Sequence, residues 1–226
     1  MFDAIARRYD FLNHFLSFGI DRIWRKKAVK IIGRHVRNPE IIDVATGTGD
    51  LAIEALRLNP VSIKGIDISA KMLDEGNKKI RRKGYEGIIE LVRCESEDIL
   101  FPDNRFDVAM AGFGVRNFSD PLRGLSEMCR VLKPGGMVMI LEFSNPQRFP
   151  FRNIFSFYFR RILPVTGRLF SGNRVAYSYL PDSVVRFPDN ERFLRLLSGA
   201  GFAGVKQKRL TGGIVSIYTG FKPAMQ

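Results

Sequence analysis

The stretch Ile41-Ile42-Asp43-Val44-Ala45-Thr46-Gly47-Thr48-Gly49-Asp50 decides the fold of this chain. An apolar run reaches an acid and then a tight Gly-x-Gly turn, and a helical pattern follows over 50–58. A second apolar run, 61–66, ends at Asp67, which follows Gly47 by 20 residues. Glycines in such a turn let the backbone bend sharply and let a ligand approach the amides, while Asp67 can accept both hydroxyls of a ribose. This order predicts a strand, a turn, a helix and a second strand that bind a nucleotide-type cofactor.

The turn by itself is compatible with two cofactors. Gly47, Gly49 and Ala52 satisfy the dinucleotide fingerprint in its G/A variant, so an NAD enzyme is one interpretation. Asp43 favours a different cofactor, because it precedes Gly47 by four residues, where it can meet a cationic amino group. The downstream order over 106–143, a strand, a helix, a Lys-Pro-Gly-Gly turn and another strand, is typical of class I methyltransferases. We therefore expect S-adenosylmethionine as the cofactor.

Strands and helices alternate along the chain from residue 40 to residue 143. The predicted strands are 40–45, 61–66, 88–93, 106–111 and 137–143, and the predicted helices are 50–58, 69–83 and 121–132. Such alternation gives a parallel sheet with helices on both faces. A later helix over 191–197 and a hairpin of strands 205–209 and 214–221 predict an antiparallel end strand. The predicted fold class is α/β: a class I S-adenosylmethionine-dependent methyltransferase with a seven-stranded, mostly parallel, Rossmann-like sheet.

A single methyltransferase domain is predicted over residues 1–226, with a helical cap at 1–38 and a helical lid at 144–188, inserted after the fifth strand. The segment 144–180 holds no Asp or Glu, and its arginines are Arg148, Arg152, Arg160, Arg161, Arg168 and Arg174. Helical spacing places one apolar stripe in it, formed by Phe151, Ile154, Phe155, Tyr158, Phe159, Ile162 and Leu163. Such a stripe either packs on the core or forms a lid that meets a lipophilic substrate or the bilayer.

Composition excludes several classes of protein. No apolar run approaches the roughly 18 residues of a membrane-spanning helix, and the N-terminus has no secretory apolar region. Cys94 and Cys129 lie on separate predicted elements, so buried free thiols and a cytoplasmic location, extending to the inner face of the membrane, are expected. Two histidines and no Cys/His cluster predict no metal site. The net charge of +13 is compatible with nucleic acid, anionic lipid or simple solubility.

Longer motifs resemble one known family nearly from end to end. The glycine turn and Lys133-Pro134-Gly135-Gly136 are generic to class I methyltransferases. Met1-Phe2-Asp3-Ala4-Ile5-Ala6 resembles a family's opening motif. The specific motifs are Phe113-Gly114-Val115-Arg116-Asn117, Leu141-Glu142-Phe143-Ser144, and Tyr177-x-Tyr179-Leu180-Pro181 with Phe187-Pro188. The chain resembles the ubiquinone/menaquinone biosynthesis C-methyltransferases. It begins without the short leader that many family members carry, which leaves open whether its N-terminus is complete.

The resemblance implies a set of cofactor residues beyond Asp43, Gly47 and Gly49. Thr48 in the turn and Asp67 on the ribose match the family pattern. The adenine end falls at Glu95 and Ser96, where the family often has Asn or Asp followed by Ala. Gly112 replaces a residue that is commonly Ser, so a side-chain hydrogen bond is lost there. The full predicted set is Asp43, Gly47, Thr48, Gly49, Asp67, Glu95, Ser96 and Gly112.

The resemblance also implies methyl transfer to a ring carbon of a polyprenyl hydroquinol. Removing a neighbouring hydroxyl proton gives a phenolate whose ortho carbon is electron-rich, so a base and an anion-stabilising group are needed. Arg116 is expected to stabilise the phenolate or polarise a water, Asn117 to orient that water, and Tyr9 is a third catalytic candidate. From this role, Arg116→Ala is expected to spare the melting temperature while lowering turnover by about 100-fold or more.

Several substrates and partners stay open. Demethylmenaquinol, giving menaquinol, is favoured over the alternative, 2-polyprenyl-6-methoxy-1,4-benzoquinol of ubiquinone biosynthesis. An RNA methyltransferase and a non-catalytic lipid-binding module are more remote alternatives. No nucleic-acid partner is expected, because the chain shows no RNA-recognition motif. Peripheral membrane association is expected, and a homodimer is compatible with the resemblance.

Overall fold

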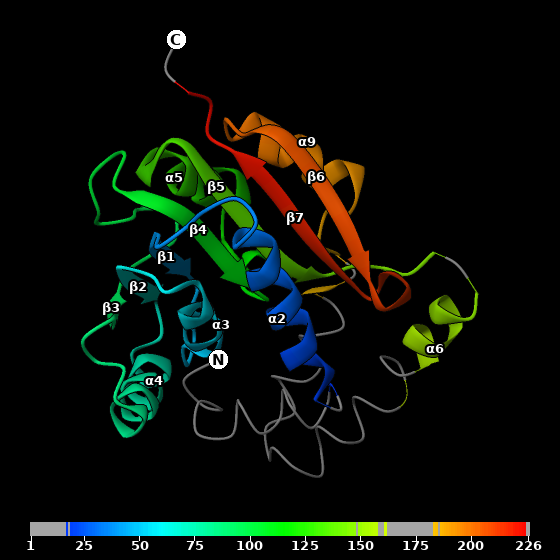
Figure 1. Ribbon diagram of the computed structural model, residues 1–226. Helices are drawn as coiled ribbons and strands as arrows, with labels where there is room; N and C mark the ends of the chain where they lie inside the picture. The colour runs from blue at the N-terminus through cyan, green and yellow to red at the C-terminus, as the bar shows by residue number, and fades with distance from the viewer. Residues whose placement is uncertain are drawn as a thin grey trace.

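The computed structural model describes residues 17, 19–147, 149–157, 161, 183–184 and 186–224. Within this part of the chain seven strands form one sheet in the order β3-β2-β1-β4-β5-β7-β6 (Figure 1). The strands are β1 Glu40–Val44, β2 Ser62–Asp67, β3 Ile89–Arg93, β4 Phe106–Gly112, β5 Leu132–Phe143, β6 Ala203–Leu210 and β7 Val215–Phe221. The α-helices are α2 Ile20–Ile32, α3 Asp50–Ala55, α4 Ala70–Lys83, α5 Pro121–Val131, α6 Phe151–Phe157 and α9 Glu191–Gly199.

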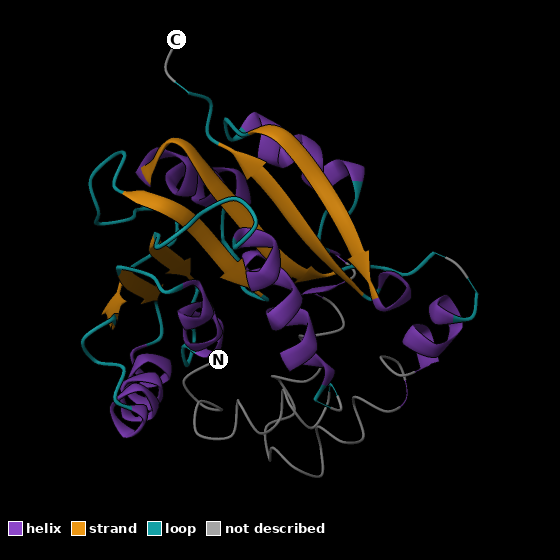
Figure 2. Cartoon of the chain, viewed as in Figure 1, coloured by secondary structure: helices purple, strands orange, loops and turns teal. Residues whose placement is uncertain are grey.

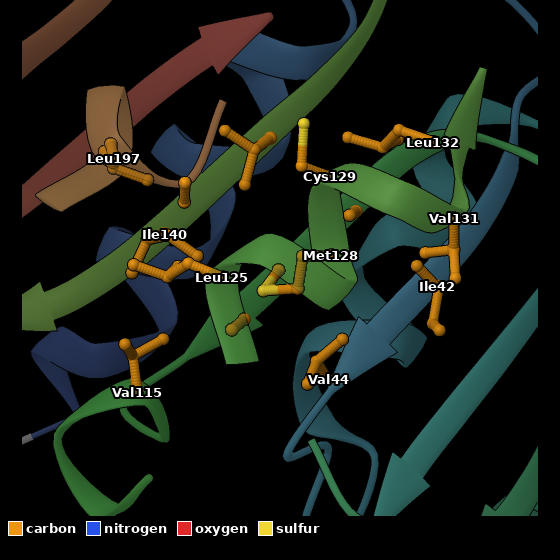
Figure 3. Packing of buried hydrophobic residues seen from close by; sticks show 14 of the residues in the cluster. Ile42, Val44, Val115, Leu125, Met128, Cys129, Val131, Leu132, Ile140 and Leu197 are labelled. Atoms are coloured by element: carbon orange, nitrogen blue, oxygen red, sulfur yellow. The ribbon is translucent and has the colours of Figure 1, made fainter. Parts of the chain in front are cut away.

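Alternate residues of each central strand pack on opposite faces of the sheet, as the period of two requires. On one face Ile41, Val108 and Met139 pack against helices α2, α3 and α4. On the other face Ile42, Ala109 and Ile140 pack against α5 and α9, the cluster that Figure 3 shows from close by. Helices therefore cover both faces of the sheet, as predicted and as Figure 2 shows in cartoon form.

Local signals set the ends of the helices near the site. Ser69 caps α4, its side chain accepting a hydrogen bond from the Met72 amide at 3.2 Å, and Gly84 ends the helix in the left-handed conformation. Asp120 caps α5 in the same way, with Pro121 in the first turn. The helix predicted over 50–58 is shorter than expected, because its last turn, Leu56–Leu58, is 3-10.

One detail of the predicted sheet is wrong. The Lys-Pro-Gly-Gly segment is no turn ahead of the fifth strand but part of β5, which begins at Leu132 and pairs irregularly with β4 between Phe106 and Val108. The predicted hairpin is confirmed at the end of the sheet, where β7 pairs antiparallel with both β5 and β6 and β6 forms the edge. A hairpin predicts that two strands pair but not which of them joins the sheet, because that choice depends on tertiary packing.

Several expectations fall on parts of the chain that the structure does not describe. Tyr9 and the rest of 1–16 lie outside the described residues, as does most of the predicted lid from 158 to 182. The described start of that segment, helix α6, divides the predicted apolar stripe: Phe155 is 8% exposed, while Phe151 is 37% exposed. Cys94 and Cys129 are free and buried, as predicted. Among the described helices none has the length and apolarity to cross a membrane.

The order of the strands determines where a ligand can bind. The chain runs outward from β1 to β2 and β3, then returns to place β4 on the other side of β1. At this reversal the loops after β1 and β4 diverge to opposite faces, which leaves a crevice at the carboxyl ends of the strands. The glycine turn follows β1, and the Phe113–Asn117 segment follows β4.

Candidate cofactor site

The glycine turn after β1 is held in a tight backbone conformation. Gly47 has φ 57° and Gly49 has φ 80°, values in the left-handed region that glycine adopts without strain. The amide of Gly49 donates to the Thr46 carbonyl at 3.0 Å, and the amide of Thr46 donates to the Ile66 carbonyl of β2 at 2.9 Å. Gly114 packs so closely that a Cβ atom there would lie 2.5 Å from the Ala45 Cβ. The turn is therefore clamped between β2 and the segment after β4.

Asp67 joins this turn to the end of β2. One carboxylate oxygen accepts the Gly47 amide at 2.9 Å, and the other accepts the Ser69 amide at 2.9 Å. Each oxygen carries a second lone pair that a hydroxyl can use. Asp67 thus orders the turn as well as facing the pocket, a double role that the sequence spacing did not reveal.

Asp43 lies under the turn at the end of β1 and is almost fully buried. Its carboxylate accepts a hydrogen bond from the Thr46 hydroxyl at 2.6 Å. Burial raises the pKa of Asp43 from 3.8 to about 7; the hydrogen bonds from Thr46 and from the Ala52 amide oppose this rise, and the neighbouring charge of Asp67 adds to it. A buried carboxyl group of this kind can form an ion pair with a cationic group of a ligand.

One pocket gathers most of the predicted cofactor residues. Seven of the eight line it: Asp43, Gly47, Thr48, Asp67, Glu95, Ser96 and Gly112. Gly49 does not line it among the described residues; it is the N-cap of α3, so its contribution is to the turn. Gly112 has little spare room, since a Cβ atom would lie 3.1 Å from Leu51 Cδ2. The Ser96 hydroxyl donates to Glu97 at 2.5 Å, so Ser96 is bonded within its own loop.

The charge of the pocket agrees with a cationic cofactor. Its acidic lining residues are Asp43, Asp50, Asp67, Glu95 and Glu97. Arg25 of α2 is the one basic residue among the described residues that line it. A sulfonium and an ammonium group would be stabilised in such a field, whereas a pyrophosphate would be repelled by it. The acidic residues that line the pocket therefore fit S-adenosylmethionine better than NAD.

An ion-pair network anchors the loop that carries Glu95 and Ser96. Arg130 on α5 pairs with Glu127 at 2.7 Å and donates to the Ile99 carbonyl at 2.7 Å. Glu127 in turn accepts the Ile99 amide at 2.8 Å, and its pKa is lowered, chiefly by Arg130. Glu97 accepts the Ser119 amide at 2.7 Å. No motif quoted above contains Glu97, Glu127 or Arg130, so the motifs do not reveal that these residues hold the loop that carries Glu95 and Ser96 at the pocket.

Arg116, beside the pocket residue Asn117, forms a buried ion pair. Its Nη1 atom donates to Glu142 Oε1 at 2.7 Å and to the Phe113 carbonyl, and its guanidinium lies over the Phe143 ring at 5.5 Å. Glu142 is fully buried, and the Arg116 Nε atom is buried with no partner among the described residues. Asn117 and Phe113 line the pocket, whereas Arg116 is not among its described lining residues. Of the predicted catalytic residues, Asn117 alone is therefore shown at the pocket, since Tyr9 lies outside the described residues.

The ion pair corrects the expectation that Arg116→Ala would spare stability. Removing one partner of a buried pair leaves an uncompensated charge and typically costs about 3–5 kcal/mol. We expect Arg116→Ala to lower the free energy of unfolding by about that amount in a denaturant titration. Adding Glu142→Gln should restore part of it, while Arg123→Ala on exposed α5 surface should change little. A fully stable Arg116→Ala protein would contradict the ion pair.

The pKa of Asp43 predicts a pH dependence of cofactor binding. Between about pH 4 and 7 the folded state keeps a proton on Asp43 that the unfolded state releases, so Asp43 lowers stability as the pH rises through this range. An incoming ammonium group needs the ionised form. Affinity for S-adenosylmethionine, measured by calorimetry from pH 7.5 down to 5.5, should fall by up to about tenfold per pH unit below 7. Asp43→Asn should bind weakly with a flat profile; an equally steep profile in this variant would refute the assignment.

Among the described residues no group of His, Cys, Asp and Glu is arranged to hold a metal ion.

Known proteins similar to this chain bear directly on the identity of the cofactor. The sequence profile of the ubiE/COQ5 methyltransferase family matches residues 1–222. A crystal structure of an S-adenosylmethionine-dependent methyltransferase from Aquifex aeolicus has the same fold, with a TM-score of 0.63 and 19% identity over 87% of this chain and 88% of that one.

Curated relatives match over nearly the whole chain. The ubiquinone/menaquinone biosynthesis C-methyltransferase UbiE of Geotalea daltonii is 50% identical over 224 residues, 98% of this chain and 94% of that protein. The demethylmenaquinone methyltransferase of Bacteroides fragilis is 46% identical over 223 residues, 98% of this chain and 91% of that protein. The predicted cofactor, S-adenosylmethionine, is confirmed by this kinship. On the strength of the profile and of these relatives, the chain belongs to the ubiE/COQ5 methyltransferase family.

Proposed function

We propose that the chain methylates the ring carbon of demethylmenaquinol with S-adenosylmethionine, giving menaquinol. The observation that carries this proposal is the family match over residues 1–222, in which the specific motif 113–117 follows β4 at the edge of the pocket. The Bacteroides fragilis relative is named for demethylmenaquinone. The name of the Geotalea daltonii relative covers both quinones, so methylation of 2-polyprenyl-6-methoxy-1,4-benzoquinol is kept as the second candidate.

Different residues of the chain would bind different groups of the cofactor. S-adenosylmethionine supplies an electrophilic methyl group on a sulfonium. Asp43 would bind its ammonium group and Asp67 the ribose hydroxyls, with Glu95 and Ser96 beside the adenine. Holding the donor rigidly against the acceptor converts a bimolecular displacement into an effectively unimolecular one, which lowers the barrier by several kcal/mol.

Activation of the quinol is assigned to the segment after β4. Asn117 lines the pocket and would orient a water that takes the hydroxyl proton. Arg116 would act on the phenolate through its positive charge, and its ion pair with Glu142 holds that charge in one place. Tyr9 remains a predicted third participant. The bound cofactor and quinol would displace water from the pocket, so the approaching phenolate and sulfonium attract each other strongly.

A side-by-side assay tests the proposed reaction. Labelled methyl transfer should be measured with demethylmenaquinol and with the methoxybenzoquinol, both reduced and with equal prenyl tails. We expect the higher kcat/KM with demethylmenaquinol. Asn117→Ala should lower kcat by about 100-fold, the scale of losing one preorganised polar group, with cofactor affinity unchanged. Transfer to the benzoquinol alone would select the second candidate, and transfer to RNA but to neither quinol would reject both.

We also propose that the start of the predicted lid contacts the membrane or the prenyl tail. Phe149 and Phe157 flank this part of the chain and are 79% and 62% exposed, in a stretch without acidic residues. Large exposed aromatic side chains beside arginines are typical of surfaces that lie on anionic lipid. Peripheral attachment at the inner membrane face follows from this proposal. A homodimer stays a prediction.

Exposed and buried phenylalanines of this segment should respond differently to substitution. Phe149→Ser combined with Phe157→Ser should spare the melting temperature, weaken binding to anionic vesicles, and raise KM for a long-tailed quinol far more than for a tail-less one. The buried Phe155→Ser is the matched control and should lower stability by several kcal/mol. Equal kinetic effects of the double variant on both substrates would contradict lipid contact.

A further inference from the structure

Arg25 stands out because it does not match the charge of the pocket that it lines. Five carboxylates face this pocket, and Arg25 is the one basic side chain among its described lining residues. It comes from α2, which precedes β1, whereas the other described lining residues lie between Asp43 and Ser119. Arg25 is 9% exposed, and a buried guanidinium is costly to desolvate, so its position calls for an explanation.

The contacts of Arg25 hold it at the glycine turn. Its Nη2 atom lies 2.5 Å from Asp21 on the same helix and 3.2 Å from Asp50, the first residue of α3. Asp50 is also bound by Lys79 at 2.7 Å, and Lys79 donates to the Thr48 hydroxyl at 3.1 Å. The guanidinium is therefore fixed beside the turn rather than free to swing into solvent. It is also near Asp43, whose ionised form it favours.

The proposed cofactor has one group that this acidic pocket would repel. At the methionine end S-adenosylmethionine carries an ammonium and a carboxylate on the same carbon. Asp43 suits the ammonium, but the carboxylate would then lie close to Asp43 and Asp50, and among the described lining residues only Arg25 could offer it a positive charge. Backbone amides of the turn supply only part of that balance, whereas the Arg25 guanidinium adds several N–H donors and a positive charge that Asp21 and Asp50 share.

We infer that Arg25 binds the α-carboxylate of S-adenosylmethionine, so that helix α2 selects cofactors that carry this carboxylate. This inference rests on the proposed function, since it needs the methionine end of the cofactor to lie at Asp43. Asp21 and Asp50 act as positioning residues, because they hold the guanidinium in place. The competing account makes Arg25 a structural link between α2 and α3 that never touches the ligand.

Two ligands that differ only in the carboxylate separate these accounts. Calorimetry should compare S-adenosylmethionine with its decarboxylated form on the wild-type protein, on Arg25→Gln, and on Lys26→Gln. Lys26 is exposed on the same helix and loses the same charge, so it controls for long-range electrostatics. Wild type and Lys26→Gln should prefer S-adenosylmethionine by tenfold or more. Arg25→Gln should lose at least tenfold in affinity for it, while its affinity for the decarboxylated form stays within about threefold.

Comparing both ligands on both proteins separates loss of the carboxylate contact from a general loss of structure. An Arg25→Gln protein that loses affinity for both ligands equally would overturn the inference, since a structural link affects both alike. Equal affinity of the wild-type protein for the two ligands would overturn it without any variant, even if Arg25→Gln fails to fold. Wild-type protein that binds neither ligand would instead reject the proposed cofactor, and is thereby distinguished from failure of the carboxylate contact alone.

Discussion

The parallel pairing of β1 with β2 on one side and β4 on the other is the constraint on which the site depends. Asp43 lies opposite Gly65 of β2 and Met110 of β4 in these ladders. Because all three strands run in one direction, the turns that follow them meet at one edge of the sheet. The glycine turn and Asp67 become neighbours there, although 20 residues separate Gly47 from Asp67. Without this register the same motifs would be dispersed.

Charge is arranged around the site in two different ways. The pocket wall is acidic and accessible to a ligand, which suits a cationic cofactor. Behind this wall, carboxylates are paired with arginines: Glu142 with Arg116, and Glu127 with Arg130. Such pairs neutralise charges that burial would otherwise make costly, and they hold the loops that face the ligand. Arg116 therefore has a structural role that is inseparable from any role in catalysis.

Family membership and residue roles rest on different kinds of evidence. The kinship is clear from the whole chain, because matches of 46–50% identity extend over 98% of it. Roles of single residues depend on geometry that motifs do not encode. The F-G-x-R-N motif brings Asn117 to the pocket but turns Arg116 toward Glu142, so two adjacent motif residues have different surroundings.

The sequence by itself determined the alternation of strands and helices, the glycine turn and the acids at 43 and 67, because these follow from local periodicity and backbone conformation. It did not determine that β7 lies between β5 and β6, or that Lys133–Gly136 lies within β5. Nor did it show that Arg25 reaches the cofactor pocket from α2. These features depend on which surfaces pack together and which charges are buried as a result. Strand order and long-range contacts of this kind depend on the free energy of the whole fold, and therefore only the tertiary structure decided them.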